Sequence, residues 1–296
     1  KNNKLDGKIA FKLYDTFGFP LDLTQDYLKS KKIDVDVESF DASMKLQKEE
    51  ARSSWKGSGD GNTEKLWFDI ARKTKPTVFK GYDETTLKAN VTALVLDSEV
   101  VDELSDKIKK SAIITDESCF YAESGGQVGD KGIISTENAE FKVTDTRKTP
   151  QGIFIHFGNV ISGNFKIGHE VKLKVDTSLR DLIKKNHSAT HLLHAALRNN
   201  LGPHVAQRGS LVNENKLRFD FSHNKQISSK QIDTIQKEVT NIISNTCETQ
   251  IDIKSQEEAI KQGAMALFGE KYGEEVRVVT LGEHNNKPYS IELCGG

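Results

Sequence analysis

The chain has 296 residues, which is long enough for two domains that each bury a core. Its 42 basic and 43 acidic residues nearly cancel, so the overall charge gives no reason to expect binding to nucleic acid or to a membrane. It has no run of about eighteen apolar residues that could span a bilayer, and its start lacks the apolar core of a secretory signal. Three scattered cysteines, Cys119, Cys247 and Cys294, argue against a disulfide framework and indicate a reducing compartment, which we take to be the cytoplasm.

The first part of the chain, up to about Trp55, is predicted to be helical because apolar residues recur at helical spacing. These residues are Ile9, Leu13, Phe17, Phe40, Met44 and Leu46. Phe19-Pro20 interrupts this pattern, and we expect Asp22 or Thr24 to cap a new helix, since their side chains can accept the free amide hydrogens of a first turn. The polar, glycine-rich segment 56–62 then predicts a linker.

Residues 78–175 consist of short segments in which apolar and polar side chains alternate, separated by turn residues. This pattern is typical of a small antiparallel barrel or sandwich. Helical periodicity returns from Arg180 to about Leu201, and Gly202-Pro203 is a common helix end. Two strands, at 209–212 and 216–221, are predicted to follow.

A helix at about 229–245 and further short strands and helices complete the prediction. The whole is an α+β chain in three parts. Residues 1–62 form a helical segment with its linker, residues 63–179 form a small antiparallel β-barrel, and residues 180–296 form an α+β domain that contains the histidine helix described next.

His187 and His191 stand four residues apart on the predicted helix, so they share one face and can bind one small cation. Cys294 is a plausible third ligand for a tetrahedral zinc ion. The chain stops two residues later, so we expect any fourth protein ligand to lie beyond Gly296 and zinc to be weakly bound, absent, or completed by water or a neighbouring molecule. His194 lies on the same helical face; it is expected to be a packing residue, and it is the first substitute if Cys294 is not a ligand.

Several enzyme classes are excluded by the residues around these histidines. A zinc metalloprotease needs a glutamate after the first histidine, where this chain has Ser188. A zinc deaminase needs a pair of cysteines two residues apart, and the three cysteines here are isolated. The glycine-flanked serine of a serine hydrolase and the Gly-x-x-x-x-Gly-Lys loop of a nucleotide-binding protein are also missing.

Two further segments have unusual composition. Residues 120–130 are aromatic, then acidic, then glycine-rich, and we interpret them as a tight loop between strands in which glycines supply positive φ and Asp130 closes a turn. Residues 207–210 lead into a strand whose alternation points Leu217, Phe219 and Phe221 inward.

Six segments together resemble one family, that of the bacterial-type alanyl-tRNA synthetases. They are residues 13–24, 120–130, 186–194, 207–212, 217–223 and 292–296. Their order matches that of the family, and they extend over nearly the whole chain. The resemblance implies that residues 1–62 correspond to the end of a tRNA-recognition part, and that the remainder corresponds to the editing domain and its leading barrel.

The resemblance also implies a function. The longer enzymes attach alanine to tRNA(Ala) with ATP, at a site that is absent from this chain. The editing domain hydrolyses mischarged Ser-tRNA(Ala) and Gly-tRNA(Ala), and its zinc is held by His187, His191 and Cys294. The implied partner is therefore the aminoacylated 3′ end of tRNA(Ala); we expect no membrane contact and a monomeric chain.

The same resemblance implies a role for one residue, since Gln207 matches a position tied to substrate discrimination. Among the other residues of these segments, Thr190 is a second polar candidate, and Glu123, the nearest carboxylate in a motif, is a candidate general base. Zinc could activate a water molecule or only orient the substrate. Basic residues near this region either contact tRNA phosphates or form an ordinary solvated surface; they are Arg180, Lys184, Lys185, Arg208 and Arg218. The alternative function is a non-catalytic tRNA-docking module whose metal is purely structural.

Overall fold

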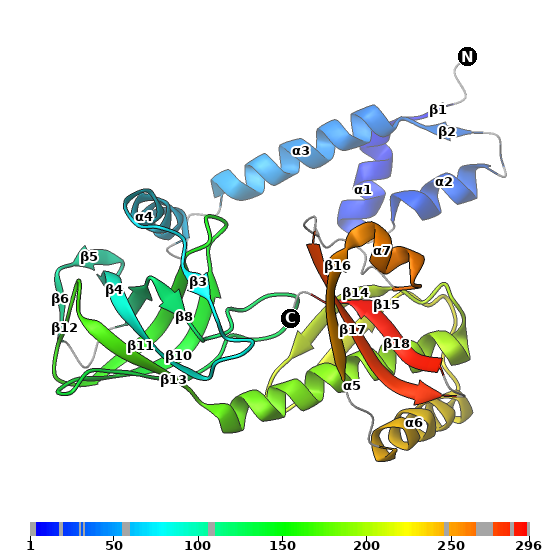
Figure 1. The fold of residues 1–296 in the computed structure, drawn as a ribbon. Coiled ribbons are helices and arrows are strands. Elements are labelled where there is room, and N and C mark those ends of the chain that lie inside the picture. The colour runs from blue at the N-terminus through cyan, green and yellow to red at the C-terminus, as the bar shows by residue number, and fades with distance from the viewer. Residues whose placement is uncertain are drawn as a thin grey trace. The chain divides into compact units, whose positions relative to one another are not determined.

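The computed structural model describes residues 4–17, 20–29, 31, 33–54, 60–105, 110–245, 249–264, 275–284 and 287–294. The chain forms two compact units, Lys1–Gly61 and Asn62–Gly296 (Figure 1). Helices and a closed antiparallel barrel occur together, which confirms the predicted α+β class. Within the described ranges, no helix is both long enough and apolar enough to cross a membrane.

The first unit is helical, as its apolar spacing predicts. Its elements are β1 (Lys4–Leu5), α1 (Gly7–Phe17), α2 (Leu21–Lys29), β2 (Asp34–Val35) and α3 (Val37–Ser54). The strands β1 and β2 pair in parallel, and Ala10, Val35 and Phe40 form the buried centre. The expected cap of α2 at Asp22 or Thr24 is wrong. The carbonyl of Pro20 already accepts the Thr24 amide at 3.1 Å, so the helix begins at Leu21, directly after the fixed φ of proline.

The predicted linker is shorter than expected. Helix α4 spans Asp60–Lys73, so its first turn occupies the last three residues of the predicted linker, and residues 56–59 lie outside the described ranges. Packing explains the difference. Ile70 is buried against the barrel, and the Trp67 ring meets that of Phe157 edge-on with centroids 5.7 Å apart.

Six antiparallel strands close the barrel in the order β13-β9-β10-β11-β7-β4, with β4 pairing back onto β13. They are β4 (Thr86–Leu96), β7 (Ser111–Thr115), β9 (Gly132–Ser135), β10 (Glu140–Lys148), β11 (Phe154–Ser162) and β13 (Glu170–Val175). The short strand β5 (Glu99–Val101) pairs with β4. Two separate pairs of short strands are β6 (Glu103–Leu104) with β12 (Phe165–Lys166), and β3 (Val78–Phe79) with β8 (Glu117–Ser118). Alternation fills the interior; in β13, Val171, Leu173 and Val175 are buried while the lysines between them are exposed.

The strand β13 leads directly into the long helix α5 (Thr177–Leu201). Asp176 caps this helix by accepting the Leu179 amide at 3.1 Å, so it begins three residues before the predicted start. It ends at Gly202, whose φ is 115°. The helix packs on α6 (Ser229–Ser244), on the hairpin of β14 (Gln207–Val212) and β15 (Leu217–Phe221), and on β17 (Glu275–His284) and β18 (Lys287–Leu293) (Figure 1).

These C-terminal elements confirm the predicted mixture of strands and helices. They are β14 (Gln207–Val212), β15 (Leu217–Phe221), α6 (Ser229–Ser244), β16 (Gln250–Ser255), α7 (Gln256–Lys261), β17 (Glu275–His284) and β18 (Lys287–Leu293). In β15 the predicted inward residues Leu217, Phe219 and Phe221 are half-buried, whereas the residues between them are exposed. The division of the second unit near residue 179 stays a prediction.

A fully buried histidine, His156, lies inside the barrel. Its Nδ1 donates to the Ile113 carbonyl at 2.9 Å, and its Nε2 accepts from the Ser118 hydroxyl at 2.8 Å, so the ring is neutral. Burial lowers the pKa of His156 from 6.5 to about 4. Between these two pH values the unfolded chain binds a proton that the folded chain does not.

The stability of the barrel is therefore expected to fall as the pH is lowered from 6.5 to 4, by about 3 kcal/mol from His156 alone. Above pH 6.5 this group has no effect, because it is neutral in both states. The measurement is the unfolding free energy of the protein and of His156→Gln across this range. The difference between the two curves isolates the histidine, and parallel curves would contradict the prediction.

Candidate metal centre

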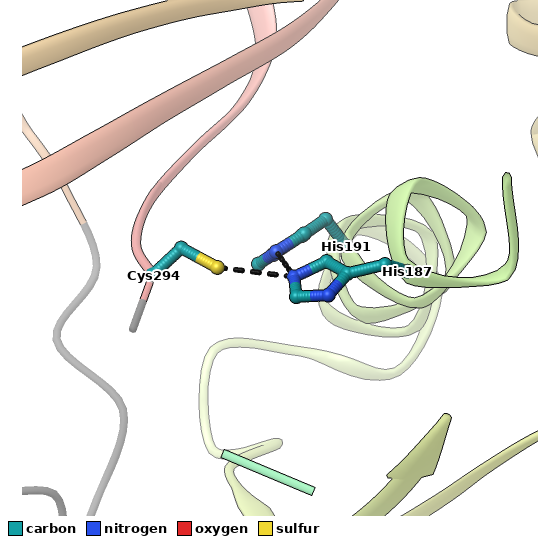
Figure 2. Close-up of side chains that lie close together, drawn as sticks. All are labelled: His187, His191 and Cys294. Carbon is teal, nitrogen blue, oxygen red and sulfur yellow. Dashed lines mark hydrogen bonds between the residues drawn. The ribbon is translucent and has the colours of Figure 1, made fainter. Parts of the chain in front are cut away.

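Three possible metal ligands converge at the end of β18 and on one face of α5. The ligand atoms of His187, His191 and Cys294 all lie within 4.8 Å of one another. The His187 Nε2 atom is 3.0 Å from His191 Nε2 and 3.0 Å from Cys294 Sγ (Figure 2). The predicted ligand set is thus brought together, across 107 positions of the chain.

Local structure explains how these side chains are presented. The two histidines lie one helical turn apart on α5, and the turn is held in place by buried neighbours such as Leu192. Cys294 follows the last residue of β18, and its amide still donates to the Arg277 carbonyl of β17 at 2.9 Å. The thiol is therefore fixed by the sheet and the imidazoles by the helix.

The outer nitrogen of each histidine has its own partner. His187 Nδ1 donates to Gln127 Oε1, and His191 Nδ1 donates to Glu292 Oε2 at 2.6 Å. An amide oxygen and a carboxylate can only accept, so both rings carry their proton on Nδ1 and turn Nε2 towards the cluster. Metal-binding histidines in proteins are commonly oriented by such partners.

Glu292 is 1% exposed and accepts from three donors. Besides His191, these are His194 Nδ1 at 3.0 Å and Ser290 Oγ at 3.2 Å. Burial favours the neutral acid, but the hydrogen bonds from His191 and His194 lower the pKa of Glu292 to about 2. His194 faces this carboxylate and the Phe219 ring, 5.1 Å away, and lies outside the group of three, as its expected packing role requires.

The charge state of the cluster favours cation binding. Burial opposes the thiolate, but hydrogen bonds from His187 and His191 lower the pKa of Cys294 to about 6. Burial also opposes a charged imidazole, yet hydrogen bonds to Cys294 and Glu292 raise the pKa of His191 to about 10. A thiolate is the form of cysteine that binds metals, and a metal that binds here releases a proton from His191.

The donor set fits a metal ion on chemical grounds. With both Nδ1 atoms occupied, the two Nε2 atoms and one sulfur point at a common centre, and the release of the His191 proton on metal binding leaves a lone pair on each of these three atoms. One cation satisfies all three at once. Two nitrogens and one thiolate are typical zinc ligands, so His187, His191 and Cys294 would hold the ion.

The three remaining predicted site residues have other surroundings. The Thr190 hydroxyl is buried and donates to the Asn186 carbonyl of its own helix at 2.8 Å. Gln207 is the first residue of β14 and is half-buried, at an irregularity of the hairpin. Glu123 is half-exposed, with its carboxylate 3.8 Å from the guanidinium of Arg147. Glu123 does not belong to the converging group of three.

One expectation about basic residues needs correction. Arg180 was expected as a possible phosphate ligand, but its side chain is only 12% exposed and binds within the protein. It pairs with Asp130 and donates to the carbonyls of Gly81 and Cys119 at 2.9 and 2.6 Å. The reason is its position at the start of α5, directly against the barrel. Arg218 pairs with Asp220 on an exposed surface. Lys184, Lys185 and Arg208 are exposed as well.

Neither of the two residues that orient the histidines, Gln127 and Glu292, is predicted from the sequence. The position of Glu292 could have been predicted, because it lies two residues before Cys294 and residues two apart on a strand share a face. Gln127 is a polar residue between Gly126 and Gly129 in a segment interpreted as a plain turn. Nothing local to that segment shows that it reaches the histidine helix.

Comparison with known proteins defines the class. A family model described as tRNA synthetases class II (A) matches residues 1–179, which is more than half of the chain. The chain therefore belongs to the class II tRNA synthetases.

The most similar relatives narrow this class to one branch. An alanine–tRNA ligase from Mesorhizobium japonicum is 49% identical over 297 residues, covering 99% of this chain and 33% of the relative. One from Rhizobium johnstonii is 49% identical over 303 residues, covering 100% of this chain and 34% of the relative. The resemblance to alanyl-tRNA synthetases is thereby confirmed, and the chain spans about one third of the length of these relatives.

Proposed function

We propose that this chain carries the editing activity of an alanine–tRNA ligase, the hydrolysis of the ester that joins serine or glycine to tRNA(Ala). The single observation that carries the proposal is the convergence of half-buried His187 with buried His191 and Cys294, with both imidazoles oriented by outer partners. On this proposal residues 180–296 form the editing domain, the metal is zinc, and the protein acts in the cytoplasm.

The need for such a site is physical. A pocket built for alanine gains only about 1–3 kcal/mol from the methyl group that glycine lacks, and an added hydroxyl is rejected poorly. A second site that hydrolyses the wrong products supplies the missing discrimination. The relatives are named as ligases of alanine and tRNA; on our proposal the ATP-dependent joining reaction is carried out by parts of such an enzyme other than this chain.

The residues of the chain have distinct proposed roles. His187, His191 and Cys294 would hold the zinc ion, and the chemistry that zinc would supply there is Lewis acidity towards an ester carbonyl or a water molecule. Gln207 and Thr190 distinguish the substrate, through hydrogen bonds to the serine hydroxyl that alanine lacks. Glu123 is the third candidate, as a general base, and its half-exposed carboxylate beside Arg147 is accessible to water.

The proposed partner is the aminoacylated 3′ end of tRNA(Ala). Lys184 and Lys185 are exposed on α5 just before His187, and Arg208 is exposed on β14 just after Gln207. These positive charges stand beside the site residues in the chain, where they can meet the phosphates of the 3′ end.

The test is deacylation of Ser-tRNA(Ala) by the zinc-loaded chain, with Ala-tRNA(Ala) as the matched substrate. We expect hydrolysis of the seryl ester that stops when a chelator removes zinc and returns when zinc is restored, with the alanyl ester largely spared. A zinc-loaded, folded chain that binds tRNA(Ala) but hydrolyses neither ester would overturn the proposal in favour of a docking module with a structural metal.

A further inference from the structure

The glycine-rich loop 120–130, which the barrel contributes, is clamped at both of its ends. Asp130 accepts from the Tyr121 amide at 2.7 Å and from Arg180 Nε at 3.1 Å, which closes the loop and ties it to α5. On its other side the loop pairs with Val212 at the end of β14. The Val212 amide donates to the Gly126 carbonyl at 2.8 Å, and the Val128 amide donates to the Val212 carbonyl at 3.1 Å.

Two glycines allow this close approach. Gly126 has a φ of 84°, and a Cβ placed on it would lie 2.5 Å from the Ser210 carbonyl oxygen. A Cβ on Gly129 would lie 2.1 Å from the Thr146 carbonyl oxygen. Both contacts are with backbone, which cannot move aside, so any side chain at these positions would push the loop away from β14 or from the barrel. The loop is therefore held in one place.

The fixed loop places Gln127 next to His187. Its side chain is buried, and its Oε1 accepts the Nδ1 proton of His187, which is 60 positions away in the chain. In the neutral ring the proton is then on Nδ1, which leaves the lone pair on Nε2, the nitrogen that faces His191 Nε2 and Cys294 Sγ. The hydrogen bond selects both the tautomer and the ring orientation that a metal needs.

We propose that Gln127 is a positioning residue of the metal site, and that the barrel loop is as much a part of this site as α5 and β18. The inference rests on the proposed metal site and does not depend on whether the chain hydrolyses an ester. Loss of such an outer hydrogen bond typically weakens metal binding 10- to 100-fold, so this range is expected for Gln127→Ala.

The test measures metal affinity by competition with a chelator, with Zn²⁺ and with Co²⁺, whose thiolate charge-transfer band reports an intact ligand set. Gln127→Ala is expected to lose about 10- to 100-fold in affinity. Gln127→Glu keeps an acceptor oxygen at the same reach, so it is expected to retain affinity within a few-fold. The ¹⁵N shifts of His187 should show the Nδ1-protonated ring in the parent protein and in Gln127→Glu, and a mixture of tautomers in Gln127→Ala.

The matched control is Gln151→Ala, which removes the same side chain from an exposed turn of the barrel and should change neither affinity nor tautomer. Wild-type affinity in Gln127→Ala would overturn the inference. Equal losses in Gln127→Ala and Gln127→Glu would also overturn it, since both variants would then act through packing. If Gln127→Ala weakens metal binding as expected but the protein does not hydrolyse Ser-tRNA(Ala), the proposed function fails and this inference stands. If the protein hydrolyses Ser-tRNA(Ala) but Gln127→Ala keeps wild-type metal affinity, this inference fails and the proposed function stands.

Discussion

Replacement of Cys294 by serine is expected to weaken zinc binding by more than about 100-fold and to abolish deacylation of Ser-tRNA(Ala). Removal of a ligand costs more than removal of a partner that only orients one, which already costs 10- to 100-fold. The serine hydroxyl is a poor zinc ligand because it stays protonated, whereas His187 and His191 both favour the thiolate at Cys294. The affinity is measured by competition with a chelator.

Cys119 provides the matched control, because it is the other buried free cysteine among the described residues. It lies in the barrel core, where burial raises the pKa of its thiol to about 11, so it is no thiolate at neutral pH. Cys119→Ser is expected to lower the unfolding free energy by about 1–3 kcal/mol through the buried hydroxyl and to leave zinc affinity unchanged. Zinc affinity within about threefold of wild type in Cys294→Ser would exclude Cys294 as a ligand.

The parts of the fold that the sequence predicted are those governed by local periodicity. Val171, Leu173 and Val175 alternate with lysines, and this alternation alone defines β13 and its inner face. His187 and His191 are four residues apart, and helical geometry alone places their imidazoles together. In each case the prediction depends only on residues within one or two helical turns or a few positions of a strand.

The orienting residues required contacts that no local pattern contains. Gln127 and Glu292 meet the histidines across 60 and 101 positions of the chain. The glycines in the loop of Gln127 do not reveal this contact, because glycines with positive φ are common in ordinary turns. Only the contact of Gly126 with the backbone of Ser210 shows that these glycines serve a close approach.

The start of α4 shows how packing overrides composition. Asp60 to Asn62 have low helix propensity and were predicted to be linker, yet they begin a helix. The helix is stabilised further along, where Ile70 is buried against the barrel and Trp67 meets Phe157. Once those turns are packed, extending the helix backwards costs little, because nucleation has already occurred.

Replacement of Asp130 by alanine is expected to lower the unfolding free energy by about 3–5 kcal/mol, because it leaves the Arg180 guanidinium inside the protein without a counter-charge. The two side chains are 3% and 12% exposed. Arg180 cannot simply swing into water without giving up its bonds to the Gly81 and Cys119 carbonyls. Urea unfolding in the presence of a chelator measures this effect separately from any change in metal binding.

The exposed pair Arg147–Asp145 is the matched control, with an N–O distance of 2.8 Å and side chains that are 61% and 31% exposed. Solvent screens this pair, so Asp145→Ala is expected to cost at most about 1 kcal/mol. The double variant Arg180→Met with Asp130→Leu removes both charges and should recover much of the loss, since the penalty comes from the unpaired charge. Equal effects of Asp130→Ala and Asp145→Ala would show that burial does not strengthen the Arg180–Asp130 pair.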